Sequence, residues 1–380
     1  MTVTQSLEIF SHFQQVEDPR VDRTKLHSLY EMIVMALCAA LCGAEGWVDV
    51  ERFAKSQRRW FQRFLKLENG VPSHDTFGRV FARLDNEQFL TCLVGWLEIF
   101  GHSMQDQGVA IDGKTLRRSF DNATGKKALH VVSAWASGLR LCLGQVAVDE
   151  KSNEIPAVVQ LLELLELSGA VVTLDAMHCQ KETAAAIRDQ KADYILPVKG
   201  NQPTLHELLI DLFVGYGEQD YRDPKLRTQK TTETNRGRLE ERICYVAPAP
   251  RSLIESGEWK DIRSVGMLYR LRQEPGKEPE EAVTFFISSL PPGVRRIAKH
   301  LRGHWGVENA LHWVLDVTFS EDQSRIRKGH GPEIASIFRR LALSILQQDT
   351  TIKSSIRGKR LQAGWNTDVL DRILTNIGQN

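Results

Sequence analysis

The sequence predicts an α/β protein in which a helical N-terminal region precedes a domain built around a mixed sheet. Apolar residues recur at helical spacing in roughly the first hundred residues, and short apolar strands alternating with helices follow. A chain of 380 residues is also too long for one ordinary core. We therefore expect a helical domain over 1–101, an α/β domain over 102–350 and a C-terminal tail over 351–380, with fraying in the last ten residues or so.

The N-terminal region reads as short helices separated by glycine turns. Apolar residues from Tyr30 to Leu41 share one helix face, Gly43 and Gly46 interrupt the pattern, and a second helix carries Phe53 and Trp60. A further helix begins after Ser73, a typical N-cap. This arrangement is what a helix-turn-helix DNA-binding module requires. A helical scaffold without DNA contacts fits it equally well.

The order of elements in the second region is the informative part of the fold prediction. Strands are expected at Val109–Asp112, Leu129–Trp135, Leu139–Val148, Val171–Asp175 and Tyr194–Val198, with helices over 156–167 and 181–190. The order β-β-β-α-β-α-β is that of a ribonuclease-H-like domain. Three strands before the first helix argue against a dinucleotide-binding fold. Pro197 suggests an end or an edge of the sheet.

The region after residue 202 is expected to carry an insertion at about 203–290. It has a polar stretch over 216–238, then short strands around 240–246 and 283–288. The Pro291–Gly293 segment breaks the pattern, a long helix runs from Val294 to about Leu315, and another covers 334–348.

Composition sets limits on the class of protein. Apolar content of 42% and charged content of 26% are typical of soluble globular proteins, and no apolar run reaches the roughly 18–20 residues of a membrane span. We expect a cytoplasmic protein without a membrane partner, in which Met32–Leu41 is a buried helix. Six scattered cysteines without a Cys-x-x-Cys pair favour reduced, mostly buried thiols. The net charge of +1 weighs mildly against DNA binding, although clustering matters more than the sum.

Two acidic residues stand at the ends of predicted strands. Asp112 ends the first strand of the α/β region and Asp175 the fourth, and these strands are adjacent in a ribonuclease-H-like sheet. One such aspartate is more often a turn cap. Two neighbouring carboxylates repel each other unless a cation joins them, and Mg²⁺ prefers such oxygen ligands.

Glu308 is the third candidate acid. Ile297, Leu301, Leu311 and Leu315 predict the apolar face of the long helix, and Glu308 is expected on that same face. A charge there is costly unless it is paired or bound to metal. The alternative is a rotated helix with a solvated Glu308, and the nearby rival acids are Asp316, Glu321 and Asp322.

A zinc site is the competing interpretation of this helix. His300, His304, Glu308 and His312 recur every four residues, and histidines at this spacing suit zinc. The string His-Glu-x-x-His is absent, however, and steps of four drift around a helix. Four ligands on one ion are therefore not expected.

Four segments carry a resemblance to a known family. They are Ala110-Ile-Asp-Gly-Lys-Thr-Leu-Arg-Arg-Ser119, Thr173-Leu-Asp-Ala-Met-His178, Leu196-Pro-Val-Lys-Gly-Asn-Gln202 and Arg302-Gly-His-Trp-Gly-Val-Glu-Asn-Ala-Leu-His-Trp-Val-Leu-Asp-Val317. They resemble insertion-sequence transposases with a DDE catalytic domain, in the branch that includes H-repeat-associated proteins. The resemblance covers nearly the whole chain.

This resemblance implies a mechanism and a set of partners. Asp112, Asp175 and Glu308 would form the catalytic, metal-binding triad, holding two Mg²⁺ ions for which Mn²⁺ substitutes. The activity would be cleavage of double-stranded DNA at element ends and strand transfer into target DNA, by a homodimer or larger assembly. Related families place Tyr and Arg before the Glu and Lys after it, whereas Leu301 and His304 take the upstream places here.

Basic and polar residues near the three acids are the expected DNA contacts. They are Lys114, Arg117, Arg118, Lys199, Asn201, Arg302 and Arg325. Any one of them alone is more often a solvated surface charge. Trp305 and Trp313 are able to stack on bases, but core packing is the favoured role for both. Two alternatives stay open: a metal-dependent nuclease without strand transfer, and a catalytically silent DNA-binding protein derived from a transposase.

Overall fold

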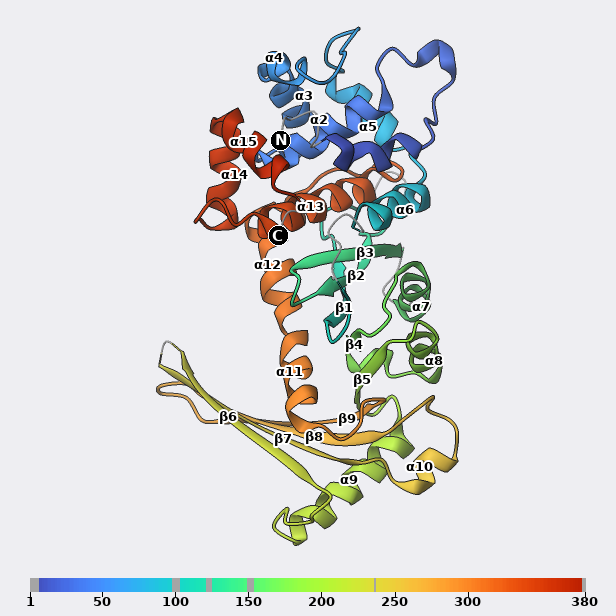
Figure 1. The fold of residues 1–380 in the computed structure, drawn as a ribbon, viewed down its shortest axis with the longest axis vertical. Coiled ribbons are helices and arrows are strands. Elements are labelled where there is room, and N and C mark those ends of the chain that lie inside the picture. The colour runs from blue at the N-terminus through green and yellow to red at the C-terminus, as the bar shows by residue number, and fades with distance from the viewer. Residues whose placement is uncertain (1–6, 98–102, 121–124, 149–153, 236, 378–380) are drawn as a thin grey trace. The chain divides into compact units, whose positions relative to one another are not determined.

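The computed structural model describes the chain except for residues 1–6, 98–102, 121–124, 149–153, 236 and 378–380 (Figure 1). The expected boundary at 101/102 lies outside the described residues. The chain divides into two compact units, one of 1–103, 113–157 and 308–380 and the other of 104–112 and 158–307. Within the described residues, every helix is too short or too polar to cross a bilayer.

The first unit is mainly helical. Its N-terminal elements are η1 (Leu7–Gln15), η2 (Asp22–Thr24), α2 (Leu29–Leu41), α3 (Trp47–Ser56), α4 (Arg58–Phe61), α5 (His74–Phe81) and α6 (Asn86–Leu97). The apolar sequence of α2 is buried along nearly its whole length, as predicted. The helix expected through Phe53 and Trp60 is two helices, because α3 ends at Ser56 and α4 begins at Arg58. Ser73 caps α5 as expected, since its Oγ accepts a hydrogen bond from the Thr76 amide at 3.3 Å.

Helix α13 (Gly331–Gln348) is the centre of this unit, and it packs against α2, α5, α6 and strand β3. Its Phe338 ring lies 5.4 Å from those of Phe81 and Phe89. The remaining elements of the unit after residue 307 are the π-helical turn η6 (Glu308–His312), α12 (Trp313–Val317), η7 (Glu321–Gln323), α14 (Ile356–Trp365) and α15 (Thr367–Thr375). The expected C-terminal tail is thus largely helical. The prediction of fraying is wrong for the residues up to Thr375, because α15 buries Leu370, Ile373 and Leu374.

Strands β2 (His130–Ala136) and β3 (Leu141–Val148) form an antiparallel pair in the first unit. The backbone turns between them at Arg140, whose φ is +54°. Both strands are almost wholly buried, and β3 packs against α13 and α6. Helix α7 (Glu154–Leu164) begins in this unit and continues into the second.

The second unit contains a mixed sheet with strand order β1-β4-β5-β9-β8-β7-β6 (Figure 1). The strands are β1 (Gly108–Thr115, divided between the units after Asp112), β4 (Val171–Thr173), β5 (Asp193–Val198), β6 (Arg227–Asn235), β7 (Arg238–Pro248), β8 (Ser264–Gln273) and β9 (Glu280–Ser288). Strands β1, β4 and β5 are parallel, and the pairs from β5 onward are antiparallel. The helices are η5 (Ala176–His178), α8 (Lys181–Asp189), α9 (Pro203–Glu218), α10 (Arg251–Glu255) and α11 (Val294–His304). The order of elements predicted between residues 109 and 198 is therefore present.

The insertion is more ordered than its polar sequence suggests. The expected polar stretch contains strand β6 and the end of α9, and β8 has no counterpart in the prediction. The polar sequence hides this strand because β6 is the last strand in the described part of the sheet. It pairs with β7 and keeps solvated side chains, so it lacks apolar alternation. Pro197 lies near the end of β5, as one alternative held. Strand β5 is not an edge, because it pairs with both β4 and β9.

Helix α11 packs against one face of this sheet. Its buried Ile297 and Leu301 join Val171, Ile195 and Phe286 in one apolar cluster. The helix ends at His304 and does not run unbroken to Leu315. The six cysteines are all free, and every one except the half-buried Cys42 is buried, which confirms that prediction.

Candidate active site

Asp112 and Asp175 lie at matching positions of two neighbouring parallel strands. The register of β1 and β4 pairs Ala110 with Thr173, and each aspartate comes two residues later, Asp112 within β1 and Asp175 just beyond the end of β4. Asp175 keeps an extended backbone, with φ −70° and ψ 158°. Because residues two apart in a strand face the same side, both aspartates project from one face of the sheet. This confirms that the first and fourth strands are adjacent.

Asp175 is exposed, and its nearest described partner is a histidine. His304 Nε2 lies 3.4 Å from Asp175 Oδ1, and His304 Nδ1 lies 3.1 Å from Thr173 Oγ1. The hydrogen bond from His304 lowers the pKa of Asp175 despite the partial desolvation of this carboxyl group, and the charges of His304, His178 and Lys199 add to the lowering. Asp175 is therefore ionised and oriented.

The surroundings of Glu308 differ from the prediction. Glu308 was expected on the apolar face of a continuous helix, but 65% of its side chain is exposed. The reason is the π-helical turn η6, which inserts a wider turn and shifts the phase of the helix. Leu311 and Leu315 remain buried, and His312 takes the buried position in place of the glutamate. Glu308 is therefore solvated, as in the alternative interpretation of a rotated helix.

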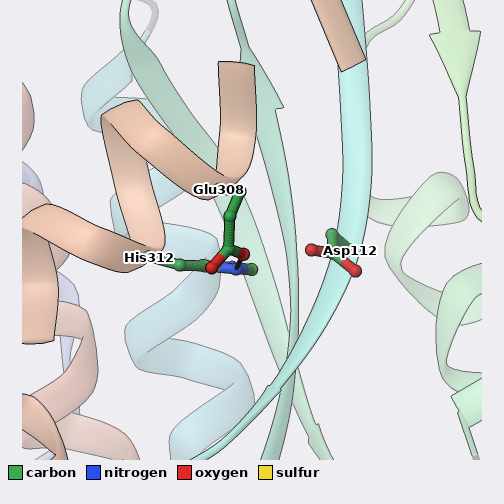
Figure 2. Close-up of side chains that lie close together, drawn as sticks. All are labelled: Asp112, Glu308 and His312. Atoms are coloured by element: carbon green, nitrogen blue, oxygen red, sulfur yellow. Dashed lines mark hydrogen bonds and ion pairs between the residues drawn. The ribbon is translucent and has the colours of Figure 1, made fainter. Parts of the chain in front are cut away.

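Glu308 also has a histidine beside it. His312 Nδ1 lies 3.3 Å from Glu308 Oε2, within the same π-helical turn. Figure 2 shows these two side chains with Asp112, and one ligand atom of each lies within 4.8 Å of the others. Carboxylate oxygens suit Mg²⁺ and Mn²⁺, whereas an imidazole nitrogen suits transition metals. The donor set therefore fits a divalent ion. Asp175 is not part of this group.

The rival acids have very different surroundings. Asp316, Glu321 and Asp322 all contact the ammonium group of Lys114, at 3.2 Å for Glu321 and 3.7 Å for Asp322. Glu321 is fully buried and also pairs with Arg340 at 2.7 Å. Because these carboxylates are neutralised by fixed cations, they have little capacity left for a metal.

The zinc interpretation gains no support from the histidine positions. His300 Nε2 lies 3.1 Å from Asp106 Oδ1, whereas His304 and His312 contact Asp175 and Glu308. Among the described residues, the group able to hold a metal includes neither His300 nor His304. The sequence analysis considered His304 and His312 as possible zinc ligands and did not predict that either would contact one of the catalytic acids. For His312 a signal was present in its spacing of four residues from Glu308, whereas the contact of His304 with the distant Asp175 leaves no such local signal.

The expected DNA-contacting residues differ in their environments. Lys114 is buried among carboxylates. Arg117 pairs with Asp322 at 3.2 Å, and Arg302 pairs with Glu233. Asn201 donates a hydrogen bond to the Ala176 carbonyl at 2.9 Å, which ties together the segments that follow β5 and β4. Arg117 and Arg302 are exposed despite these ion pairs, and Arg118, Lys199 and Arg325 are exposed as well.

Two tryptophans near Glu308 are exposed, so the prediction that they pack in the core is wrong. The exposed fraction is 59% for Trp305 and 57% for Trp313. The guanidinium of Arg270 lies 5.5 Å from the centre of the Trp305 ring, a cation–π distance. The residue after the end of α11 therefore presents an aromatic ring to solvent, with a cation of β8 beside it.

Comparisons with known proteins agree with the resemblance found in the sequence. Residues 103–345 match the family described as "Transposase DDE domain", and residues 10–97 match the one described as "DDE_Tnp_1-associated". The "H repeat-associated putative transposase YhhI" of Escherichia coli K12 is 36% identical over 98% of both chains. "Putative transposase YncI" of E. coli O157:H7 is 34% identical over 98% of this chain and 95% of its own. A shorter relative, "Inactive transposase YbfQ", is 32% identical over 20% of this chain and 90% of its own.

Proposed function

Because this chain belongs to the family of transposases with a DDE domain, we propose that it cleaves DNA at the ends of a mobile element and transfers the strands to target DNA. The observation that carries the proposal is the matched placement of Asp112 and Asp175, each two residues after the Ala110–Thr173 pair of the parallel strands β1 and β4. The catalytic domain is then ribonuclease-H-like, with the β6–β9 region as its insertion. A transposase role requires double-stranded DNA as substrate.

Asp112, Asp175 and Glu308 are the residues that would hold the metal. A divalent ion held by these acids would supply activation of the attacking oxygen and stabilisation of the leaving oxygen in an in-line displacement at phosphorus. His304 orients the Asp175 carboxylate, and His312 is placed to do the same for Glu308. We assign these roles to two Mg²⁺ ions, for which Mn²⁺ substitutes.

Phosphate binding falls to the exposed cations near these acids. Lys199 follows β5 and lies close enough to Asp175 for its charge to lower the pKa of that carboxyl group. Arg118 and Arg325 are also solvated and able to contact a DNA backbone. Arg302 contributes only if it leaves Glu233, with which it is paired. Joining two ends requires two active sites, so we propose a homodimer or larger assembly on DNA.

The test is metal-dependent cleavage of DNA that carries this gene and its flanks. Purified protein is incubated with Mg²⁺, Mn²⁺ or Ca²⁺, and breaks are mapped on a denaturing gel. Asp112→Asn, Asp175→Asn and Glu308→Gln are compared with Asp211→Asn, an exposed acid of α9. Each triad variant should lose more activity than the roughly 10–100-fold that loss of an outer-shell partner costs, and Asp211→Asn should remain active.

The other outcomes separate the alternatives. Breaks without joined products would indicate a nuclease that lacks strand transfer. Binding of the DNA ends without any break would favour a catalytically silent DNA-binding protein. Activity retained in Glu308→Gln would remove this residue from the triad.

A further inference from the structure

Lys114 is nearly fully buried although it carries a charge. It belongs to β1, is 9% exposed, and contacts the carboxylates of Asp316, Glu321 and Asp322. Burying an ammonium group is costly unless it is paired and hydrogen-bonded. The fold of the first unit therefore holds this side chain in one place.

The carboxylate network around Lys114 is anchored on several elements of the same unit. Glu321 Oε1 accepts hydrogen bonds from Arg340 Nη1 at 2.7 Å and from Ser336 Oγ at 3.3 Å, while its Oε2 lies 3.2 Å from Lys114. Arg340 Nε donates to Ser133 Oγ of β2 at 3.2 Å. Strands β1 and β2 are thus tied to η7 and α13 through buried, charge-assisted hydrogen bonds.

Of the three carboxylates that contact Lys114, Asp316 is the one that lies on the helix next to the proposed metal site. Asp316 lies on α12, which follows the π-helical turn carrying Glu308 without a break. Lys114 follows Asp112 by two residues on β1, so the two side chains project from the same face of that strand. Beyond its contact with His312, the exposed Glu308 side chain depends on its backbone for its position, and α12 is the next element along the chain.

We propose that Lys114 is a positioning residue. Through its ion pair with Asp316, it fixes the turn that carries Glu308 against the part of β1 that belongs to the same unit. This inference rests on the proposed function, since it takes Glu308 as a metal-binding acid. In this role Lys114 does not contact DNA, because its charge is paired with the carboxylates around it.

The experiment measures binding of Mn²⁺ to the full-length protein by titration calorimetry. Lys114→Met is compared with Lys359→Met, a matched control in the same unit. Lys359 is 6% exposed and contacts the Asp349 carboxylate at 3.1 Å and the Leu346 carbonyl at 2.8 Å. Both variants lose a buried lysine, so both are expected to be less stable. Lys114→Met should bind Mn²⁺ about 10–100-fold more weakly at unchanged stoichiometry, with a parallel loss of cleavage, whereas Lys359→Met should keep wild-type affinity.

A second variant covers the case in which Lys114→Met does not fold. Asp316→Ala removes the partner on α12, and its side chain is 33% exposed, so the buried pairs of Glu321 remain. It should weaken Mn²⁺ binding in the same way. Unchanged affinity would overturn the proposal, and a lower stoichiometry would make Asp316 a ligand and overturn it as well.

The failure of this inference is distinguishable from failure of the proposed function. If wild-type protein binds no Mn²⁺, or Glu308→Gln binds it like wild type, the proposed metal site itself is wrong. If Glu308→Gln loses binding while Lys114→Met keeps it, only the role of Lys114 is refuted. Equal losses in Lys114→Met and Lys359→Met would reduce Lys114 to a structural residue.

Discussion

The acidic side chains of two regions of this protein have opposite surroundings. The side chain of Glu321 is fully buried and contacts Lys114 and Arg340. The side chains of Asp175 and Glu308 are 64% and 65% exposed, and each lies beside a histidine. An acid neutralised by fixed cations serves the fold, whereas an exposed acid beside an imidazole keeps oxygen lone pairs for a ligand. Surroundings therefore separate the candidate catalytic acids from their rivals.

Removing one negative charge from each region should give the largest difference in the free energy of unfolding. Glu321→Gln leaves Lys114 and Arg340 buried without their shared carboxylate, and it should lower the free energy of unfolding by about 3–5 kcal/mol. Glu308→Gln is the same chemical change at a solvated position and should stay within about 0.5 kcal/mol. Urea unfolding of both variants tests this. Similar losses in the two would show that burial does not distinguish these acids.

The pH dependence of stability should report the buried acid. Burial alone raises the pKa of Glu321, but the charges of Arg340 and Lys114 outweigh it and lower this pKa from 4.5 to about 2. A carboxyl group with a depressed folded pKa stabilises the protein above its unfolded pKa and loses that contribution as pH falls towards the folded value. Stability should therefore fall by about 3 kcal/mol from this group between about pH 4.5 and 2.

The variant Glu321→Gln provides the control for this pH dependence. Its urea midpoint should change less than that of wild type over the same pH range, because the titrating group is gone. The same slope in both proteins would assign the acid sensitivity to other carboxylates, such as Asp106, whose pKa is held low by Arg296, His300 and Lys299 despite its burial.

A smaller loss of stability than for the buried acid is expected for the histidine beside an exposed acid. His304→Phe keeps the ring volume but removes the contacts with Asp175 and Thr173, and it should cost about 1 kcal/mol. Its effect on Mn²⁺ affinity and cleavage should be larger, about 10–100-fold. His300→Phe is the matched control, because His300 lies one turn earlier on α11 and contacts Asp106 instead. Equal loss of Mn²⁺ affinity in both variants would argue against a specific role for His304.

Part of the fold followed from local patterns in the sequence. Strands β1 to β5 and helices α7 and α8 were predicted because apolar runs and turn residues are local signals. The polar strand β6 gives no such signal, since its hydrogen bonds go to β7 and its side chains need not be apolar. Strand β8 was also missed. The boundaries of α3 and α4 were less clear because one apolar pattern spans both helices.

The same division applies to the candidate site. The sequence by itself determined the positions of Asp112 and Asp175, because strand-end acids after apolar runs are visible along the chain. Only the tertiary structure decided the exposure of Glu308, since the π-helical turn shifts the phase that a regular helix would have had. It also decided the partners of Lys114, which lie about two hundred residues away in the sequence. Spacing along the chain records local periodicity, but the neutralisation of a charge depends on which distant side chains the fold brings into contact with it.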